Sequence, residues 1–162
     1  MAEKIGIPLH GNKKVLFAPV TADGSVPLEA AWEELCRTYK NSVEILGGKP
    51  TKKQEYCDQQ SKPIKIFYES ASTEGKFQAY DYDLQTLVQL IGGTVVDNEW
   101  TEPEENLGKE IALRFITDSN HQITYAKVML FGSKNLKLVK DGLALIDCEF
   151  EPLLPGKIKK LP

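Results

Sequence analysis

Over residues 109–131 an alternation of apolar and polar side chains is followed by a short polar turn and a second, largely apolar run. In the first half Ile111, Leu113 and Phe115 occupy every second position, and after the turn at 118–121 further apolar residues follow. Because successive side chains of a strand point to opposite faces, this two-residue period predicts an antiparallel hairpin. The pattern favours a fold built from antiparallel strands.

Other apolar runs predict more strands and two more hairpins. Residues 13–20 combine β-branched and aromatic side chains and predict a first strand. The runs 64–70 and 76–83 are separated by a short turn segment, as are 136–139 and 143–153. We expect each of these two pairs to form a hairpin.

The segment between Pro27 and Leu46 carries two periods. Its first part has helical spacing, and the residues that recur are Leu28, Ala31, Trp32, Leu35 and Tyr39. Beyond Tyr39 the residues alternate as in a strand. We therefore expect a helical stretch near Pro27–Cys36, followed by a strand that ends near Leu46.

A short helix is predicted at Asp83–Ile91. Asp83 can accept a hydrogen bond from the free N–H groups of the first turn. Leu84, Leu87, Val88 and Ile91 form one apolar stripe, and the pair of glycines at 92–93 can end the helix in a left-handed conformation. So short a helix is marginal alone in water, so its stripe must pack on another element, which we expect to be a sheet.

The resulting fold class is mainly β with one or two short helices. We expect a β-sandwich or a partly closed β-barrel, flanked by the helix near Asp83–Ile91. The 162 residues fit a single domain spanning 1–162. Within it we expect flexible arms at 1–12 and 155–162, and a long polar loop at 47–63.

Composition narrows the function classes. The formal net charge of −3 lacks the basic excess typical of proteins that bind nucleic acid or anionic membranes. No apolar run reaches the length of a membrane span, and the first residues lack the order of a signal peptide. Cys36, Cys57 and Cys148 are far apart and predict unpaired thiols in a reducing compartment, so we expect synthesis in the cytoplasm.

No catalytic, cofactor or metal site is predicted. Residues 46–51 resemble a phosphate-binding loop but lack its first glycine, and the two histidines have no ligand spacing around them. Asp81 and Asp83 could act as a carboxylate pair, but helix capping explains Asp83 more simply. We therefore expect a protein that is not an enzyme.

The polar loop at 47–63 is the candidate for assembly contacts. Its lysines and the nearby Lys65 form a loose basic cluster, which could be a solvated surface, a protein contact or a weak nucleic-acid site. The candidate assembly residues are Lys49, Lys52, Lys53, Tyr56, Asp58 and Lys62.

Taken in order, the features from residue 13 to 153 resemble a phage major tail protein, the tail tube subunit of long-tailed bacteriophages. The resemblance rests on "AAWEEL", on the strand with Glu44, on the polar loop with Asp58, and on "IKIFYES". It continues through the pattern D-L-x-x-L-x-x-L-I-G-G-T at Asp83–Thr94, "EIALRFITDSNHQITYAKVML", and "DGLALIDCEFEPL" at Asp141–Leu153.

The resemblance implies two packed β-sheets with one helix at the flank. Six such subunits would close into a ring, and rings would stack into a tube through which DNA passes without specific binding. Gly47–Pro63 would reach a neighbouring subunit or the next ring, and Lys4–Lys13 and Pro155–Pro162 would add contacts between rings. Partners would be other copies of the chain, with tape-measure and tail-completion proteins, in a virion tail made in the bacterial cytoplasm.

Two other readings remain open from the sequence. Tube proteins of the type VI secretion system share this fold, and other virion or secretion components have similar sandwiches. A β-barrel that binds a small ligand, or an enzyme, would instead need a deep apolar pocket with a few polar groups.

Overall fold

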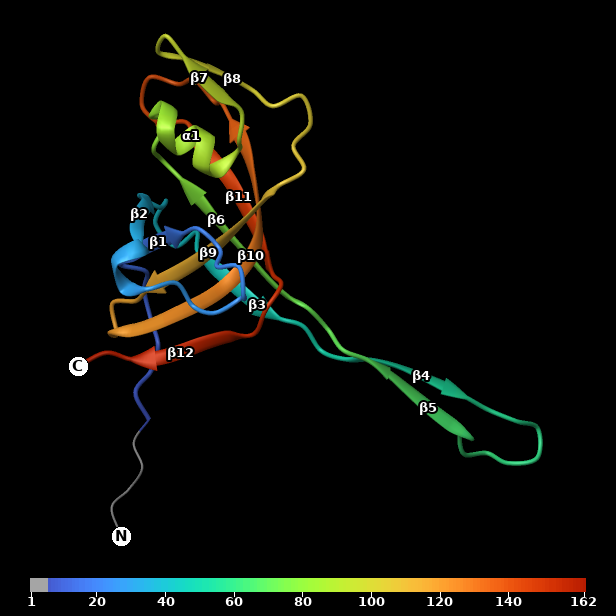
Figure 1. Ribbon diagram of the computed structural model, residues 1–162. Coiled ribbons are helices and arrows are strands. Elements are labelled where there is room, and N and C mark those ends of the chain that lie inside the picture. Colours follow the sequence, from blue (N-terminus) through green and yellow to red (C-terminus); the bar gives the residue numbers. More distant parts are fainter. Residues whose placement is uncertain (1–5) are drawn as a thin grey trace.

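The computed structural model describes residues 6–162, and the chain forms a mainly β, sandwich-like fold with one α-helix (Figure 1). The helix is α1 (Leu84–Leu90), and a short 3-10 helix covers Glu29–Ala31. The strands are β1 (Lys14–Ala18), β2 (Glu33–Cys36), β3 (Glu44–Gly47), β4 (Thr51–Glu55), β5 (Lys65–Glu69), β6 (Thr73–Ala79), β7 (Thr94–Val96), β8 (Glu99–Thr101), β9 (Lys109–Ile116), β10 (His121–Asn135), β11 (Leu145–Pro152) and β12 (Gly156–Lys160).

One antiparallel sheet provides the body of the molecule, in the order β2-β1-β9-β10-β11-β6-β3, with β12 also paired to β10. The long strand β10 connects its two halves. Its first half pairs with β12 and its second half with β11, and its register against β9 shifts between Tyr125 and Val128. A bulge of this kind bends a strand, so one continuous sheet can fold over on itself and enclose a core.

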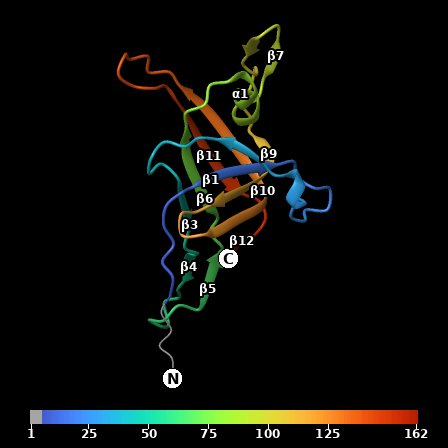
Figure 2. The same ribbon diagram turned by 90° about the vertical axis from the view of Figure 1, so that its left-hand side faces the viewer.

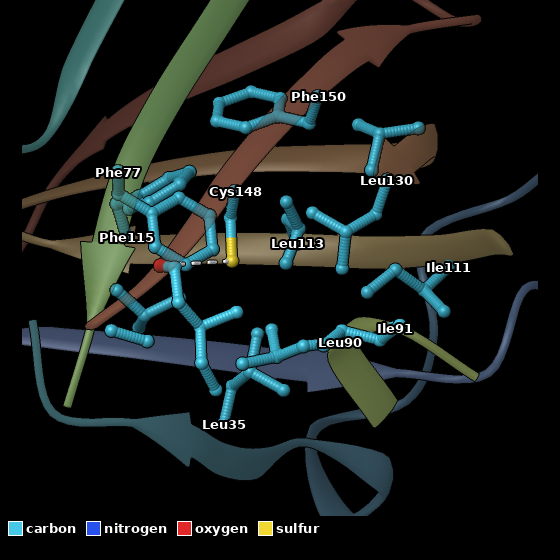
Figure 3. Close-up of a cluster of buried hydrophobic side chains, with 14 of the residues drawn as sticks. Leu35, Phe77, Leu90, Ile91, Ile111, Leu113, Phe115, Leu130, Cys148 and Phe150 are labelled. Carbon is cyan, nitrogen blue, oxygen red and sulfur yellow. Dashed lines mark hydrogen bonds between the residues drawn. The ribbon is translucent and has the colours of Figure 1, made fainter. Parts of the chain in front are cut away.

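The core lies between the two halves of the bent sheet (Figure 3). Phe77 of β6 and Phe150 of β11 meet Phe115 of β9, with ring centroids 6.2 and 5.5 Å apart respectively. All three rings are buried, and aromatic pairs at these distances stabilise a core beyond the area that they bury. The hairpin predicted over 109–131 is confirmed, because β9 pairs with β10 and Leu113, Phe115 and Leu130 are fully buried. Ala112 and Arg114, on the other face of β9, are buried as well.

Helix α1 is confirmed with both of its predicted ends. Asp83 accepts a hydrogen bond from the Thr86 N–H at 3.2 Å, and Gly92 and Gly93 have φ angles of +105° and +87°. Leu87 and Ile91 of the expected stripe are buried, and Leu90 is buried as well. The helix packs near β2, β10 and the small β7–β8 hairpin, and therefore covers one end of the sandwich.

The predicted helix near Pro27–Cys36 is wrong beyond the 3-10 turn at Glu29–Ala31. Residues 33–36 form β2, which pairs with β1 at the edge of the sheet. Trp32 instead lies against the buried Arg114 guanidinium, 4.2 Å from the ring centroid, and this guanidinium also bonds Glu29. Strand pairing and this cation–π contact hold the backbone out of the helix that the spacing predicted.

The strands of two predicted hairpins pair with other strands in the structure. Strand β5 pairs with β4, and β6 pairs with β11 and β3, so 64–70 and 76–83 do not form a hairpin. Residues 136–139 are not a strand, because β10 continues to Asn135 and itself pairs with β11. In the first case β6 pairs with the distant β11, and in the second β11 pairs with the extended β10 instead of with residues 136–139.

The predicted C-terminal arm, 155–162, is also wrong, since Gly156–Lys160 forms β12 on the edge of β10. The ring of Tyr125 lies where a side chain at Gly156 would be, so glycine allows this close pairing. Of the predicted N-terminal arm, residues 1–5 lie outside the described range. Residues 6–12 have no regular structure, and the His10 N–H donates to Ser119 Oγ at 3.2 Å.

Candidate assembly surface

Residues 47–72 form an arm that projects from the body (Figure 1). The β3–β6 pair leaves the sheet and, after a short break, continues as the two-stranded ribbon β4–β5. Turning the molecule by 90° shows the arm and the β7–β8 hairpin at opposite ends in both views (Figure 2). The break follows Gly47 and contains Gly48 and Pro50 on one side and residues 70–72 on the other.

All six candidate assembly residues lie on this arm. The connection holds Lys49, strand β4 holds Lys52 and Lys53, and the end of the arm holds Tyr56, Asp58 and Lys62. The prediction of a loop over the whole of 47–63 is wrong in part, because Thr51–Glu55 is a strand that pairs with Lys65–Glu69 over its whole length. The arm is therefore a ribbon that carries these side chains at fixed positions.

The two faces of the ribbon differ in character. Paired residues of an antiparallel ribbon share a face, so Lys52 with Tyr68 and Gln54 with Ile66 lie on one side. The Tyr56 hydroxyl donates to Gln54 Oε1 on this side as well. We call this side the apolar face of the arm.

The opposite side of the ribbon is charged. Lys53 forms an ion pair with Glu55 at 3.3 Å, and Lys65 lies 5.8 Å from the centre of the Phe67 ring. Charged neighbours therefore flank Phe67, whereas the apolar face has one charged residue, Lys52.

The sequence reasoning missed the apolar side chains of β5. The run 64–70 predicted a strand in a hairpin with 76–83, yet its apolar residues lie on the arm, and Ile64, Phe67 and Tyr68 are half or more exposed. Each residue of β5 is exposed, and the arm has no extensive contact with the body. An isolated two-stranded ribbon is at best marginally stable in water, so this arrangement suits a segment with a partner elsewhere.

A second surface lies on the outward side of β3, β6, β11 and β10. Side chains that alternate away from the core here include five carboxylates and one lysine beside the apolar Leu46 and Phe131: Glu44, Glu74, Asp147, Glu149, Glu151 and Lys76. Lys76 pairs with Glu44 at 3.5 Å. We call this side the acidic face, and it keeps an excess of negative charge.

The carboxylates considered for catalysis have structural partners. Asp81 accepts hydrogen bonds from the Arg37 guanidinium and from the Arg37 N–H, and Asp83 caps α1. Desolvation acts to raise the pKa of Asp81, but the hydrogen bonds from Arg37 outweigh it and hold this pKa below its usual value. The two aspartates are thus engaged in separate contacts.

Within residues 6–162, no three His, Cys, Asp or Glu side chains converge as a metal site would require. His121 Nδ1 lies 2.7 Å from Ser119 Oγ, and His10 lies on the N-terminal segment beside the same serine. No helix in this range is long and apolar enough to cross a membrane.

No protein-family model matches the chain. A search of curated proteins also gives no relative.

Proposed function

We propose that this protein is a structural, self-assembling subunit of a phage or phage-like tail tube. The observation that carries the proposal is the free arm, whose apolar face is not covered by any other element among residues 6–162. A contact from an arm on one copy to a different surface on the next is heterologous. Such contacts give rings when the rotation closes, and filaments along an axis when it does not.

The unpaired strand edges of the body support the same function. Strand β3 ends the order of the sheet on one side, and β12 has β10 as its one partner. Free strand edges are either protected or used for association. In a subunit that assembles with others, the free strand edges and the arm can both form contacts with neighbouring copies.

The acidic face suits the wall of a channel for DNA. Clustered Lys and Arg attract phosphates and release their counterions, whereas carboxylates repel phosphates. With five carboxylates and one lysine pointing from the same side of the sheet, this face would let DNA slide without holding it. We therefore propose that it lines the lumen.

The function is tested by replacing residues 48–72 with a two-residue Asn-Gly turn. Gly47 and Thr73 are paired in the native sheet, so a tight turn can join them without moving the body. We expect a cooperatively folded monomer that no longer forms the rings or tubes of the unaltered protein in negative-stain microscopy. An unaltered protein that stays monomeric at high concentration contradicts the proposal, and loss of folding shows that the arm belongs to the core.

A small-ligand-binding protein is the second candidate, because the body has a groove of suitable size, about 740 Å³. Binding of an apolar fluorescent probe to the monomer, with an affinity that the arm replacement leaves unchanged, would favour this function. Another virion or secretion component with the same sandwich would be distinguished by capped rings that never stack.

A further inference from the structure

The sandwich has an open side, where a groove of about 740 Å³ leads towards the core. One wall is Ile158 of β12, another is Ile45 of β3, and Leu9 of the N-terminal segment forms a third. Phe115 and Tyr125, both buried, lie at its floor. The groove therefore runs between two of the strands at the edges of the sheet, β12 and β3.

A polar atom in this groove lacks a partner. Asn12 lines the groove, and its amide nitrogen donates to Thr38 Oγ1 at 3.0 Å. Its Oδ1 atom is the one buried side-chain acceptor within residues 6–162 that has no hydrogen bond. A buried acceptor without a partner is unfavourable, so an occupant whose donor reaches Asn12 as the groove opens would be stabilised there.

The apolar face of the arm has the matching chemistry. Ile66 and Tyr68 supply apolar side chains, and Gln54 lies between them and Tyr56. Because Gln54 Oε1 accepts the Tyr56 hydroxyl, the Gln54 amide N–H groups stay available as donors. Lys52, on the same face, has no ion pair among the described residues, and neither has Asp118 at the mouth of the groove.

The arm points away from the groove of its own subunit, because it continues in the direction of β3 and β6. To fill that groove it would have to bend back on the body. It continues the β3–β6 ladder away from the body and touches no other element extensively (Figure 1). The occupant that fits is thus the arm of a second copy.

We propose that the open-side groove is the acceptor for the apolar face of a neighbouring subunit's arm. Tyr68 and Ile66 enter between β12 and β3, a donor reaches Asn12, and Lys52 meets Asp118. This inference rests on the proposed self-assembly and adds the surface to which the arm binds.

The test uses two full-length variants that each destroy one side of the contact. Tyr68→Asp places a charge on the apolar face of the arm and leaves the groove unchanged. Ile158→Asp places a charge in the groove and leaves the arm unchanged. Both side chains are about two-thirds exposed, at 66% and 68%, so neither change should unfold the body. Val96→Asp, at a residue 67% exposed on the distant β7–β8 hairpin, is the matched control.

We expect each interface variant alone to assemble about tenfold more weakly or worse, and the control to assemble like the unaltered protein. Mixed in equal amounts, the two variants should form a one-to-one dimer by mass photometry, at a concentration where each alone is monomeric. In the mixture the Ile158→Asp variant supplies an unaltered arm and the Tyr68→Asp variant supplies an unaltered groove, so one contact can form between them.

Three results would overturn the inference. The mixture could stay monomeric, Ile158→Asp could assemble as well as the unaltered protein, or the control could lose assembly equally. The first two are expected if the groove instead holds a small apolar ligand or the chain's own N-terminal residues. If Ile158→Asp fails to fold, Ile158→Thr takes its place in the mixture. Loss of the groove contact with assembly retained leaves the tube function standing, whereas an unaltered protein that never assembles removes both.

Discussion

At the scale of single residues, charged side chains in the body join segments that are far apart in the sequence. Arg114 is buried with its guanidinium over Trp32 and bonded to Glu29 at 2.9 Å, which ties the turn after β1 to β9. Arg37 and Asp81 likewise join the end of β2 to the end of β6. The Arg37–Asp81 pair adds to backbone hydrogen bonds that join the same two segments, from the Tyr39 N–H to the Gln78 carbonyl and from the Tyr80 N–H to the Arg37 carbonyl.

Asp81→Asn tests the second of these ties. Charge-assisted hydrogen bonds contribute about 1.5–3 kcal/mol, and exposure of Arg37 reduces this, so we expect a loss of about 1 kcal/mol at pH 7. The folded-state pKa of Asp81 is lowered, so its contribution is present above the unfolded pKa and is lost as the pH falls through the folded one. Urea unfolding of both proteins should therefore differ at neutral pH and converge in acid. Asp58→Asn, on the arm, should have no effect at either pH.

The three cysteines differ in reactivity. Burial raises the pKa of Cys36 to about 12, with Asp81 adding to it, and burial also raises the pKa of Cys148 strongly. Since the thiolate is the reactive form, we expect a maleimide to label the folded monomer at one thiol, Cys57 on the arm, and at three after unfolding. Mass spectrometry with peptide mapping measures this, and rapid labelling of Cys148 in the folded protein would contradict the burial described.

At the scale of elements, helix α1 is held by a close approach to the sheet. The carbonyl of Leu90 lies against the backbone of Gly132 in β10, in the space that a Cβ would need. Lys109 Nζ donates to the Val88 carbonyl at 2.9 Å, which satisfies one of the free acceptors in the last turn. The last turn of the helix is thus fixed by two strands.

Gly132→Ala should separate these elements. The added methyl group meets backbone atoms that cannot rotate away, and overpacking of this kind costs about 1–3 kcal/mol. We expect a lower unfolding midpoint in urea, with near-normal strand content by circular dichroism. Gly47→Ala is the control, because no atom lies within 4 Å of the position of its Cβ, and its midpoint should stay within error of the unaltered protein.

At the scale of the whole molecule, the distribution of charge over the surface matters more for the proposed contacts than the net charge does. The net charge of −3 is small, yet the acidic face collects five carboxylates while the arm carries several lysines. A tube built from such subunits would present the acidic face to DNA and keep the arms for contacts between proteins.

Glu149→Lys with Glu151→Lys tests the proposed lumen. Both residues are exposed on β11 and point away from the core, so the fold should persist. If assembled tubes present this face to the lumen, the double variant should bind short double-stranded DNA at low salt and release it as salt rises. Gel-shift assays measure this, and Glu104→Lys with Glu105→Lys, at two exposed positions after β8, is the control of equal net charge that should not bind. Absence of binding by folded, assembled double variant would place the acidic face elsewhere.

The sequence by itself determined the helix and the 109–131 hairpin. Asp83, the stripe at Leu87 and Ile91, and the glycines that follow act within a few residues of one another, so their energies are already present in the local pattern. The hairpin has the same advantage, since its two strands are joined by a short turn with Asn120 at a φ of 61°.

Tertiary structure alone decided the strand partners, and with them the candidate assembly surface. Strand β5 leaves the body to pair with β4, β6 pairs with a strand some seventy residues later, and residues 156–160 join β10 instead of forming an arm. Each choice compares the ladders offered by distant segments, and no local pattern contains that comparison. For this reason the sequence placed the candidate assembly residues on one segment, whereas the apolar face of that segment and the groove lined by Ile158 became visible only in the fold.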